Sequence, residues 1–197
     1  MSRFFASLLG WKLGLMLLCG AAVAGTAVFF AFPTASNEDY MPTQPIPYSH
    51  KIHAGQLKIN CKYCHIGATQ GQHALVPGLG ICMNCHRFVK PASPYIQQIK
   101  KAYEEKRQIE WVRVHELPDH VRFNHRAHVI KGVQCETCHG NVAEMDVMYQ
   151  FAPLTMGWCL GCHRGQTTPD YVRKLIYPDT GAAQGPVAPF NCSTCHY

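Results

Sequence analysis

The chain has 197 residues, 47% of them hydrophobic and 15% charged, with a formal net charge of +6 and 11 Cys beside 12 His. This length allows one domain of ordinary size, or a small domain with a membrane segment, and excludes a long multidomain enzyme. The composition excludes a disordered or collagen-like chain. Because the cysteine count is odd, pairing into disulfides does not account for every cysteine.

The N-terminal segment has the length and composition of a membrane anchor. From Leu13 to Phe32, twenty consecutive residues carry no charge, enough for a helix to cross about 30 Å of hydrocarbon. Arg3 and Lys12 precede the run, which predicts a cytoplasmic N-terminus and places everything after residue 35 on the extracytoplasmic side of the cytoplasmic membrane. A cleaved signal peptide is the alternative. Because the run continues past the small-residue cleavage site at 22–24, we expect a retained single-pass anchor.

The first 47 residues therefore divide into two parts. Residues 1–35 are expected to be the cytoplasmic end and the anchor, and Cys19 lies within that helix as a small apolar residue, with lipidation or a helix contact as the alternative. Residues 36–47 are rich in Pro, Asn, Gln, Asp and Thr, which predicts a tether. The soluble module is expected to begin near Tyr48.

Ten of the eleven cysteines belong to five copies of Cys-x-x-Cys-His, whereas this composition gives about 0.04 copies by chance. Two thiols at this spacing form thioethers with the vinyl groups of one haem, and the next imidazole binds its iron, so the pattern predicts five covalently bound c-type haems. Zinc sites would leave the fifth pair unmatched, and disulfides need no histidine. The copies are Cys61-Cys64-His65, Cys82-Cys85-His86, Cys135-Cys138-His139, Cys159-Cys162-His163 and Cys192-Cys195-His196.

Four of the seven remaining histidines form a repeated arrangement. His50 and His53 precede the first motif, and His125 and His128 precede the third, each pair following an aromatic and a small polar residue. This pattern indicates an internal duplication.

The duplication predicts how the soluble part is divided. Residues 48–90 would form a dihaem half and residues 121–197 a trihaem half. Residues 91–120 would form a helix and connector between them.

These motifs resemble the class III multihaem cytochromes c, of the c3 and c7 type. The resemblance implies a mostly irregular fold with short α-helices packed around five haems, beside the transmembrane helix. In that family the first histidine of such a pair binds the haem that follows, and the second reaches the next haem. Carried over, this implies the iron-ligand pairs His50 with His65, His53 with His86, His125 with His139, and His128 with His163.

The fifth haem, whose first ligand is His196, needs a second ligand from elsewhere. Trihaem relatives place one just upstream of the middle motif, where this chain has Met156 in the trihaem half and Leu79 in the dihaem half. Met156 is therefore the expected ligand, with His115 as the alternative, and histidine/methionine ligation would give this haem the highest potential. Further candidates are His73, His120, Met145 and Met148.

The segments between the motifs predict few regular elements. Residues 93–107 have the spacing of a capped amphipathic helix, and residues 109–115 alternate weakly, as in a short strand. Residues 165–190 are loop-rich, with one short helix expected over 169–176 and Thr168 as its cap.

The haems change the expected core and charge. About 165 residues outside the membrane leave roughly 33 per haem, too few for a conventional core, so we expect the porphyrins to form the core and the apo chain not to fold. Each ferric haem adds about −1, so the formal +6 falls to about +1. The charge is therefore no argument for binding nucleic acid.

The whole organisation resembles the pentahaem cytochrome subunit of alternative complex III. The resemblance implies an electron-transfer subunit, not an enzyme by itself. Electrons would leave menaquinol at integral-membrane quinol-binding subunits, cross an iron-sulfur subunit, and pass through this chain to a cytochrome c, a blue copper protein or a terminal oxidase. The alternatives are a small membrane-anchored quinol dehydrogenase that binds quinol itself, and a multihaem reductase, which needs a five-coordinate haem.

Overall fold

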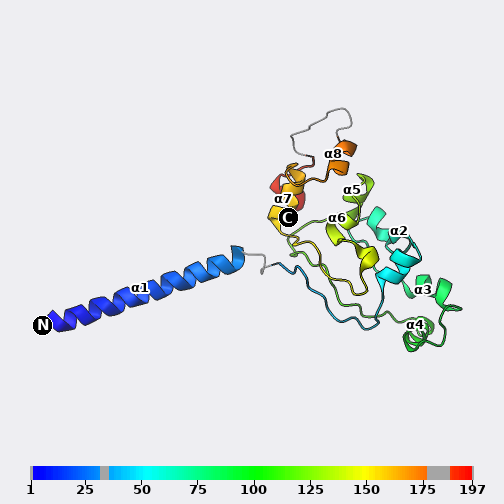
Figure 1. Ribbon diagram of the computed structural model, residues 1–197, viewed down its shortest axis with the longest axis horizontal. Helices are drawn as coiled ribbons and strands as arrows, with labels where there is room; N and C mark the ends of the chain where they lie inside the picture. Colours follow the sequence, from blue (N-terminus) through cyan, green and yellow to red (C-terminus); the bar gives the residue numbers. More distant parts are fainter. Residues whose placement is uncertain (1, 32–35, 177–186, 197) are drawn as a thin grey trace.

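The computed structural model describes residues 2–31, 36–176 and 187–196 (Figure 1). In these ranges the chain forms short helices joined by irregular segments and contains no β-strand, which confirms the expected fold class. The elements are α1 (Ser2–Ala31), η2 (Lys51–Gln56), α2 (Cys61–Cys64), η3 (Ile66–Thr69), α3 (Leu79–His86), α4 (Pro94–Glu104), α5 (His125–Ile130), α6 (Glu136–His139), η4 (Val142–Glu144), α7 (Met156–His163), α8 (Asp170–Ile176) and α9 (Cys192–Cys195).

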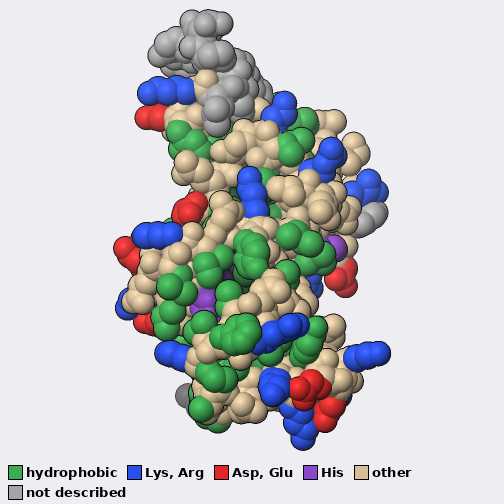
Figure 2. All heavy atoms as spheres, turned by 90° about the vertical axis from the view of Figure 1, so that its right-hand side faces the viewer, with side chains coloured by type: hydrophobic (Ala, Val, Ile, Leu, Met, Phe, Trp, Pro, Cys, Tyr) green, Lys and Arg blue, Asp and Glu red, His purple; other side chains and the backbone are tan. Residues whose placement is uncertain are grey.

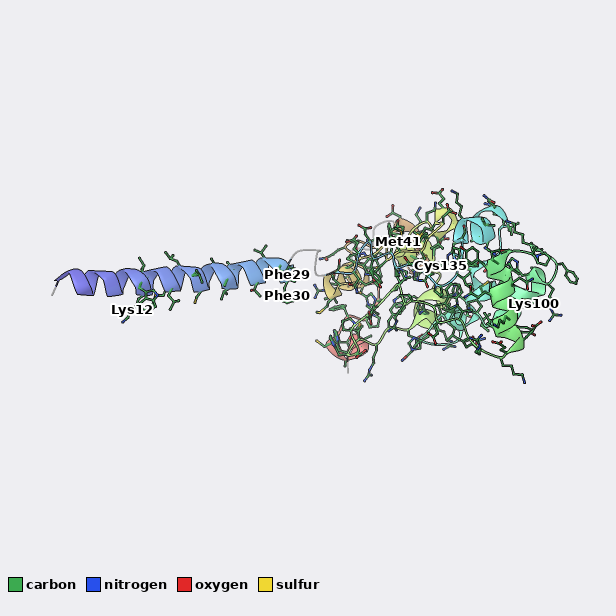
Figure 3. All side chains as sticks on the ribbon, turned by 90° about the horizontal axis from the view of Figure 1, so that it is seen from below. Lys12, Phe29, Phe30, Met41, Lys100 and Cys135 are labelled. Carbon is green, nitrogen blue, oxygen red and sulfur yellow. The ribbon has the colours of Figure 1, made fainter. Side chains whose placement is uncertain are left out.

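Helix α1 stands apart from the rest of the chain in Figures 1 and 3. Its stretch from Gly10 to Phe30 is long and apolar enough to cross a membrane, about 31 Å at 1.5 Å per residue. All side chains of this stretch are exposed, as in a helix that faces lipid. The helix therefore supports a single membrane anchor; Phe32, at the end of the predicted run, lies outside the described residues.

The segment after the anchor packs on the module, whereas the sequence predicted a tether with no such contacts. The Asp39 amide donates to the Gln150 carbonyl at 2.8 Å, and the Gln150 amide donates to the Tyr40 carbonyl at 3.0 Å. Ile46 is only 4% exposed and joins the apolar cluster described below. One buried apolar residue in a polar segment is too weak a pattern to predict this packing.

Residues 109–115 do not form the predicted strand. Instead, the side-chain amide of Gln44 donates to the Val112 carbonyl and accepts from the Val112 amide, both at 2.9 Å. The side chain thus takes the place of a neighbouring strand, because it satisfies both main-chain groups of one residue.

The apolar cluster lies between α3 and α4, at one end of the module. Helix α4 confirms the predicted amphipathic helix: it begins at Pro94 and turns Ile99 and Ala102 inward. It ends at Glu104, and the side chain of Ser93 makes no capping hydrogen bond. Lys100 and Glu104 lie on its exposed side, 3.9 Å apart, in a contact worth little at a surface. The buried members of the cluster are Ile46, Leu79, Met83, Ile99 and Ala102.

Elsewhere the module leaves much apolar surface uncovered by protein. Figure 2 shows hydrophobic side chains at the surface of one face, with histidine rings visible between them. Exposed apolar residues adjoin the first two haem motifs, among them Ile66, Leu75, Val76 and Phe88. An apolar porphyrin beside each motif would cover surface of this kind, so the distribution fits the expectation that haems complete the core.

The two repeats pack reciprocally. Element η2, which follows the first histidine of its pair, packs against η4, and α5, which carries the second pair, packs against η3. The Lys51 amide donates to the Met145 carbonyl at 2.9 Å, and the His125 amide donates to the Gln72 carbonyl at 3.3 Å. Each histidine pair is therefore held by the segment that follows the first haem motif of the other repeat.

A substitution at Gly55 would test this packing, because a Cβ atom there would lie 2.1 Å from the Ala143 carbonyl oxygen. We expect Gly55→Ala to separate η2 from η4 and to cost about 1–3 kcal/mol of stability. Gly71→Ala is the matched control, because no atom lies within 4 Å of its Cβ position. Thermal unfolding of the two holoproteins, followed by Soret absorbance, should show a lower Tm for Gly55→Ala alone; equal Tm values would contradict the contact.

Candidate haem sites

The structure brings together the four histidine pairs that the sequence predicts. Metal–imidazole bonds are about 2 Å long, so two imidazoles on opposite sides of one iron have ring centres about 6 Å apart. The observed separations are 6.5 Å for His50 and His65, 6.1 Å for His53 and His86, 6.3 Å for His125 and His139, and 6.0 Å for His128 and His163. The residues therefore fit a haem iron at each of these four places.

The ring nitrogens also have the arrangement that a haem ligand needs. The Nδ1 atom of His65 lies 2.6 Å from the Leu75 carbonyl oxygen, and that of His163 lies 2.6 Å from the Pro189 oxygen. A carbonyl only accepts, so Nδ1 carries the proton and donates it, and Nε2 keeps a free lone pair for iron. Main-chain carbonyls hold four more rings in this way: those of His53, His86, His125 and His128.

An aromatic ring braces each upstream pair. Tyr48 stacks on His53 with ring centres 4.4 Å apart, and Phe123 stacks on His128 at 4.7 Å. Each also meets the first histidine of its pair edge-on. The repeated aromatic residue was visible in the sequence, but its function of orienting the imidazoles becomes clear only in the structure.

Burial favours the neutral form of two of the paired imidazoles and of one motif thiol. It lowers the pKa of His50 to about 4 and that of His139 to about 3, so both imidazoles are neutral near pH 7 and able to bind a metal. Burial also raises the pKa of Cys138 to about 11, which disfavours the thiolate that zinc requires. In the described ranges, no three His, Cys, Asp or Glu side chains are grouped to hold a metal ion, and no disulfide forms.

The five motifs follow one another in space in the order second, first, third, fourth, fifth. Burial, and then the neighbouring Cys61 of the first motif, raises the pKa of Cys135 of the third. At the other junctions burial, and then a thiol of the adjoining motif, raises a cysteine pKa: Cys64 acts on Cys82, Cys162 on Cys138, and Cys195 on Cys159. Figure 1 shows α3, α2, α6 and α7 crossing the module in this order.

His115 is not at the fifth motif, where it was the alternative ligand. Its Nε2 atom lies 3.2 Å from Nδ1 of His139. If His139 donates there, as the other ring Nδ1 atoms do to carbonyls, His115 accepts through Nε2 and carries its own proton on Nδ1. At the third motif, the His115 imidazole thus takes the place of the main-chain carbonyl that accepts from the motif histidine at the first, second and fourth motifs. No sequence pattern indicated the contact, which joins residues 24 positions apart.

The His115 contact predicts an altered potential for the third haem. A hydrogen-bond acceptor on Nδ1 makes a ligating imidazole more basic and so stabilises the ferric iron. His115→Ala should therefore raise the midpoint potential of one haem by on the order of 60 mV, a tenfold change for a one-electron couple. His115→Gln should restore most of it, since its carbonyl accepts. Redox titration with the exposed His73→Ala as control checks this, and an unchanged titration would contradict it.

At the fifth motif the structure places the ring of His120, not Met156, against His196. The two ring centres are 5.5 Å apart and the rings are inclined by 23°. Met156, the expected ligand, begins α7 and is 62% exposed. The duplication pointed to Met156 because the two middle motifs align, but His120 precedes the repeat and lies outside that alignment.

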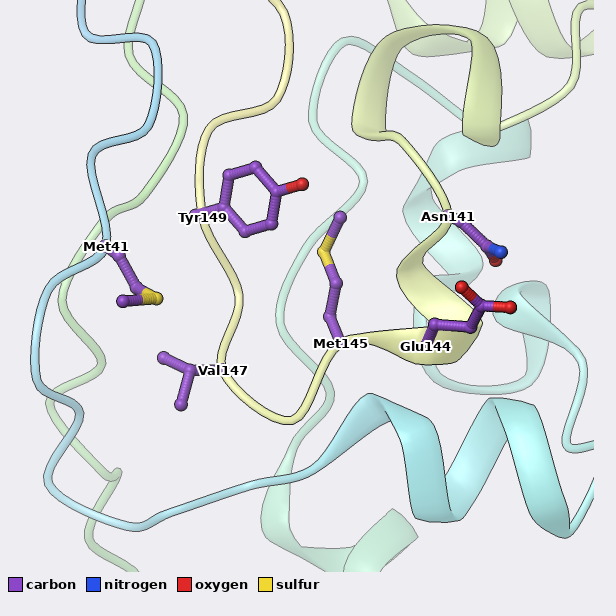
Figure 4. Close-up of a pocket in the computed structure, with 6 residues that line it drawn as sticks. All are labelled: Met41, Asn141, Glu144, Met145, Val147 and Tyr149. Carbon is purple, nitrogen blue, oxygen red and sulfur yellow. The ribbon is translucent and has the colours of Figure 1, made fainter.

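A cavity of about 420 Å³ lies between the segment after the anchor and the residues that follow the third haem motif (Figure 4). Met41 from the segment after the anchor, and Val147 and Tyr149 from the segment after η4, line it. Its volume is in the range of small-molecule pockets. No motif histidine lines it.

The predicted helix over 169–176 is present as α8 (Asp170–Ile176). Thr168, the predicted cap, donates its hydroxyl to the Cys162 carbonyl instead, at 2.5 Å. The bond ties the start of α8 to the fourth haem motif. Residues 177–186 of the predicted loop lie outside the described ranges.

Comparison with known proteins finds similarity to multihaem cytochromes c. Residues 121–197 match the family described as cytochrome c7 and related cytochrome c. This part of the chain is similar to c7-type multihaem domains. The chain is also 28% identical over 183 residues, 90% of its length and 78% of the relative's, to the "Menaquinone reductase, multiheme cytochrome c subunit" of Nitratidesulfovibrio vulgaris (strain Hildenborough). That similarity extends the likeness to a multihaem cytochrome beyond the matched domain.

Proposed function

We propose that this chain is a membrane-anchored electron-transfer subunit that binds five c-type haems and relays electrons for a quinone-reactive respiratory complex. The observation that carries the proposal is that every motif histidine faces a second histidine ring, 5.5–6.5 Å away. Two ligands on each iron leave no position for a substrate, which favours electron transfer over catalysis. Bound haem would supply one-electron iron chemistry.

The chain's own residues would anchor and orient the haems. The ten motif cysteines would form the thioethers, and the motif histidines His65, His86, His139, His163 and His196 would be the first ligands. Nδ1 hydrogen bonds fix seven of the ten rings about their axes, so little rearrangement of these rings accompanies a change of charge. The adjacency of the motifs, from the second to the fifth, supports a continuous path for electrons through the module.

The finer proposal is a subunit of the alternative complex III type. Its support is the order of one N-terminal apolar helix, five haem motifs and two upstream histidine pairs. Electrons would pass from menaquinol through membrane subunits and an iron-sulfur subunit to this chain, and on to a cytochrome c, a blue copper protein or a terminal oxidase. The positive residues Arg3 and Lys12 favour a cytoplasmic N-terminus and a haem module on the opposite side.

In the second candidate function, electrons flow in the opposite direction, from this chain toward menaquinone. The name of the relative, menaquinone reductase, favours it. Histidine/histidine ligation also favours it, because it gives lower potentials than histidine/methionine ligation. Both candidates require partner subunits that react with quinone.

Purification of the complex from native membranes tests the proposal. We expect quinone-binding membrane subunits and an iron-sulfur subunit to copurify, and a menaquinol analogue to reduce the haems within the complex. Reduction only by a low-potential donor, followed by menaquinone reduction, would replace the first candidate by the second. Recovery of the chain alone, with inhibitor-sensitive quinol oxidation, would contradict both and support the quinol dehydrogenase alternative.

A further inference from the structure

The segment at the junction of the connector and the trihaem half packs against the fifth haem motif. Residues 118–122 run beside α9, where Val121 and His196 form an isolated antiparallel bridge. The Arg122 amide donates to the Cys195 carbonyl at 2.7 Å, and the Val121 amide donates to the Pro118 carbonyl at 2.9 Å. Main-chain contacts thus fix the residue before Val121 next to the motif.

That residue is His120, and its side chain completes a fifth ring pair. Its ring centre is 5.5 Å from that of His196, compared with 6.0–6.5 Å in the other four pairs. The 23° inclination lies within the 7–59° that the other pairs span. His120 is exposed, so a rotamer adjustment of its side chain would give the about 6 Å that an iron needs.

Three of the other residues considered for this position are engaged elsewhere or exposed. His115 is held by His139. Met145 is 7% exposed, and its carbonyl accepts from Lys51 in the first repeat. Met156 is largely exposed at the start of α7.

We propose that His120 is the second axial ligand of the fifth haem, so that all five irons carry two histidines. The proposal rests on the haem assignment made above. It moves the ligand from the position just upstream of the middle motif, where the trihaem resemblance puts it, to the connector between the repeats. It also removes the reason to expect the fifth haem to have the highest potential, because no methionine binds it.

The test compares His120→Ala with Met156→Leu in the full holoprotein; Leu occupies the matching position of the first repeat. Electron paramagnetic resonance, near-infrared magnetic circular dichroism and carbon monoxide titration report ligation directly. We expect His120→Ala to convert one haem in five to a high-spin form that binds one equivalent of carbon monoxide. Met156→Leu should match the wild type. The reverse pattern would overturn the proposal.

Two further measurements keep the test decisive if His120→Ala does not mature. The wild-type near-infrared spectrum should lack the band of histidine/methionine haem, and its presence would overturn the proposal. His120→Met should introduce that band and raise one potential. The haem count distinguishes this inference from the proposed function: five haems with a methionine ligand would sink only the assignment of His120, whereas fewer than five would contradict the proposed function.

Discussion

Produced without haem attachment, the full chain will keep α1 but will not fold its module. Helices α2, α6 and α9 have four residues each, far below the length at which a helix is stable alone. In the described ranges one apolar cluster is buried, between α3 and α4. Domains typically have a free energy of unfolding of about 5–15 kcal/mol. Haem attachment should therefore supply most of that stability here.

Limited proteolysis and circular dichroism of the apo and holo chains measure this effect. The apo module should be digested at the rate of an unfolded chain, and the holo module should resist. A protease-resistant apo module would contradict the claim that haems form the core.

The loss of stability on removing one haem should depend on where its attachment site lies in the order of motifs. Removing the third attachment site with Cys135→Ala and Cys138→Ala should unfold most of the module, because this site lies in the middle of the row and touches the first. Removing the second with Cys82→Ala and Cys85→Ala should cost less, since it lies at the end of the row. Similar losses of Soret-monitored Tm for the two variants would contradict the order of sites.

Replacing a second ligand by methionine should produce the largest electronic change. His128 faces His163 with ring centres 6.0 Å apart, so His128→Met should convert the fourth haem to histidine/methionine ligation. Axial ligands shift potentials over about 0.8 V, and we expect a rise on the order of 100 mV. At about 59 mV per tenfold change, this haem would hold an electron roughly fiftyfold more strongly than before.

Potentiometric titration resolves the change as one haem moving to higher potential. His73→Met is the matched control, because His73 is exposed and lies outside the five ring pairs. A titration of His128→Met that matches the wild type would show that His128 binds no iron.

Local spacing made most of the site predictable. A Cys-x-x-Cys-His motif brings its reactive groups together within five residues, and the duplicated histidine pairs kept their spacing in both repeats. The structure accordingly places His50 and His125 opposite the motif histidines expected for them. Helix α4 was predictable for a similar reason, because its apolar period and its proline are local features.

Contacts between distant residues were not predictable in the same way. His120 meets His196, and His115 meets His139, through tertiary packing that no single segment encodes. Reciprocal packing of the repeats is a further case, because a duplicated sequence is compatible with pairing inside one repeat or across two. Ile46 was missed because one apolar residue has no period.

Carbon monoxide titration of the purified, reduced holoprotein, together with a haem assay, tests most directly whether this chain is a relay of five six-coordinate haems. We expect five haems per chain and no binding of carbon monoxide, because each iron would have two histidine ligands. A haem that binds carbon monoxide stoichiometrically in the wild type, or fewer than five haems, would contradict this assignment.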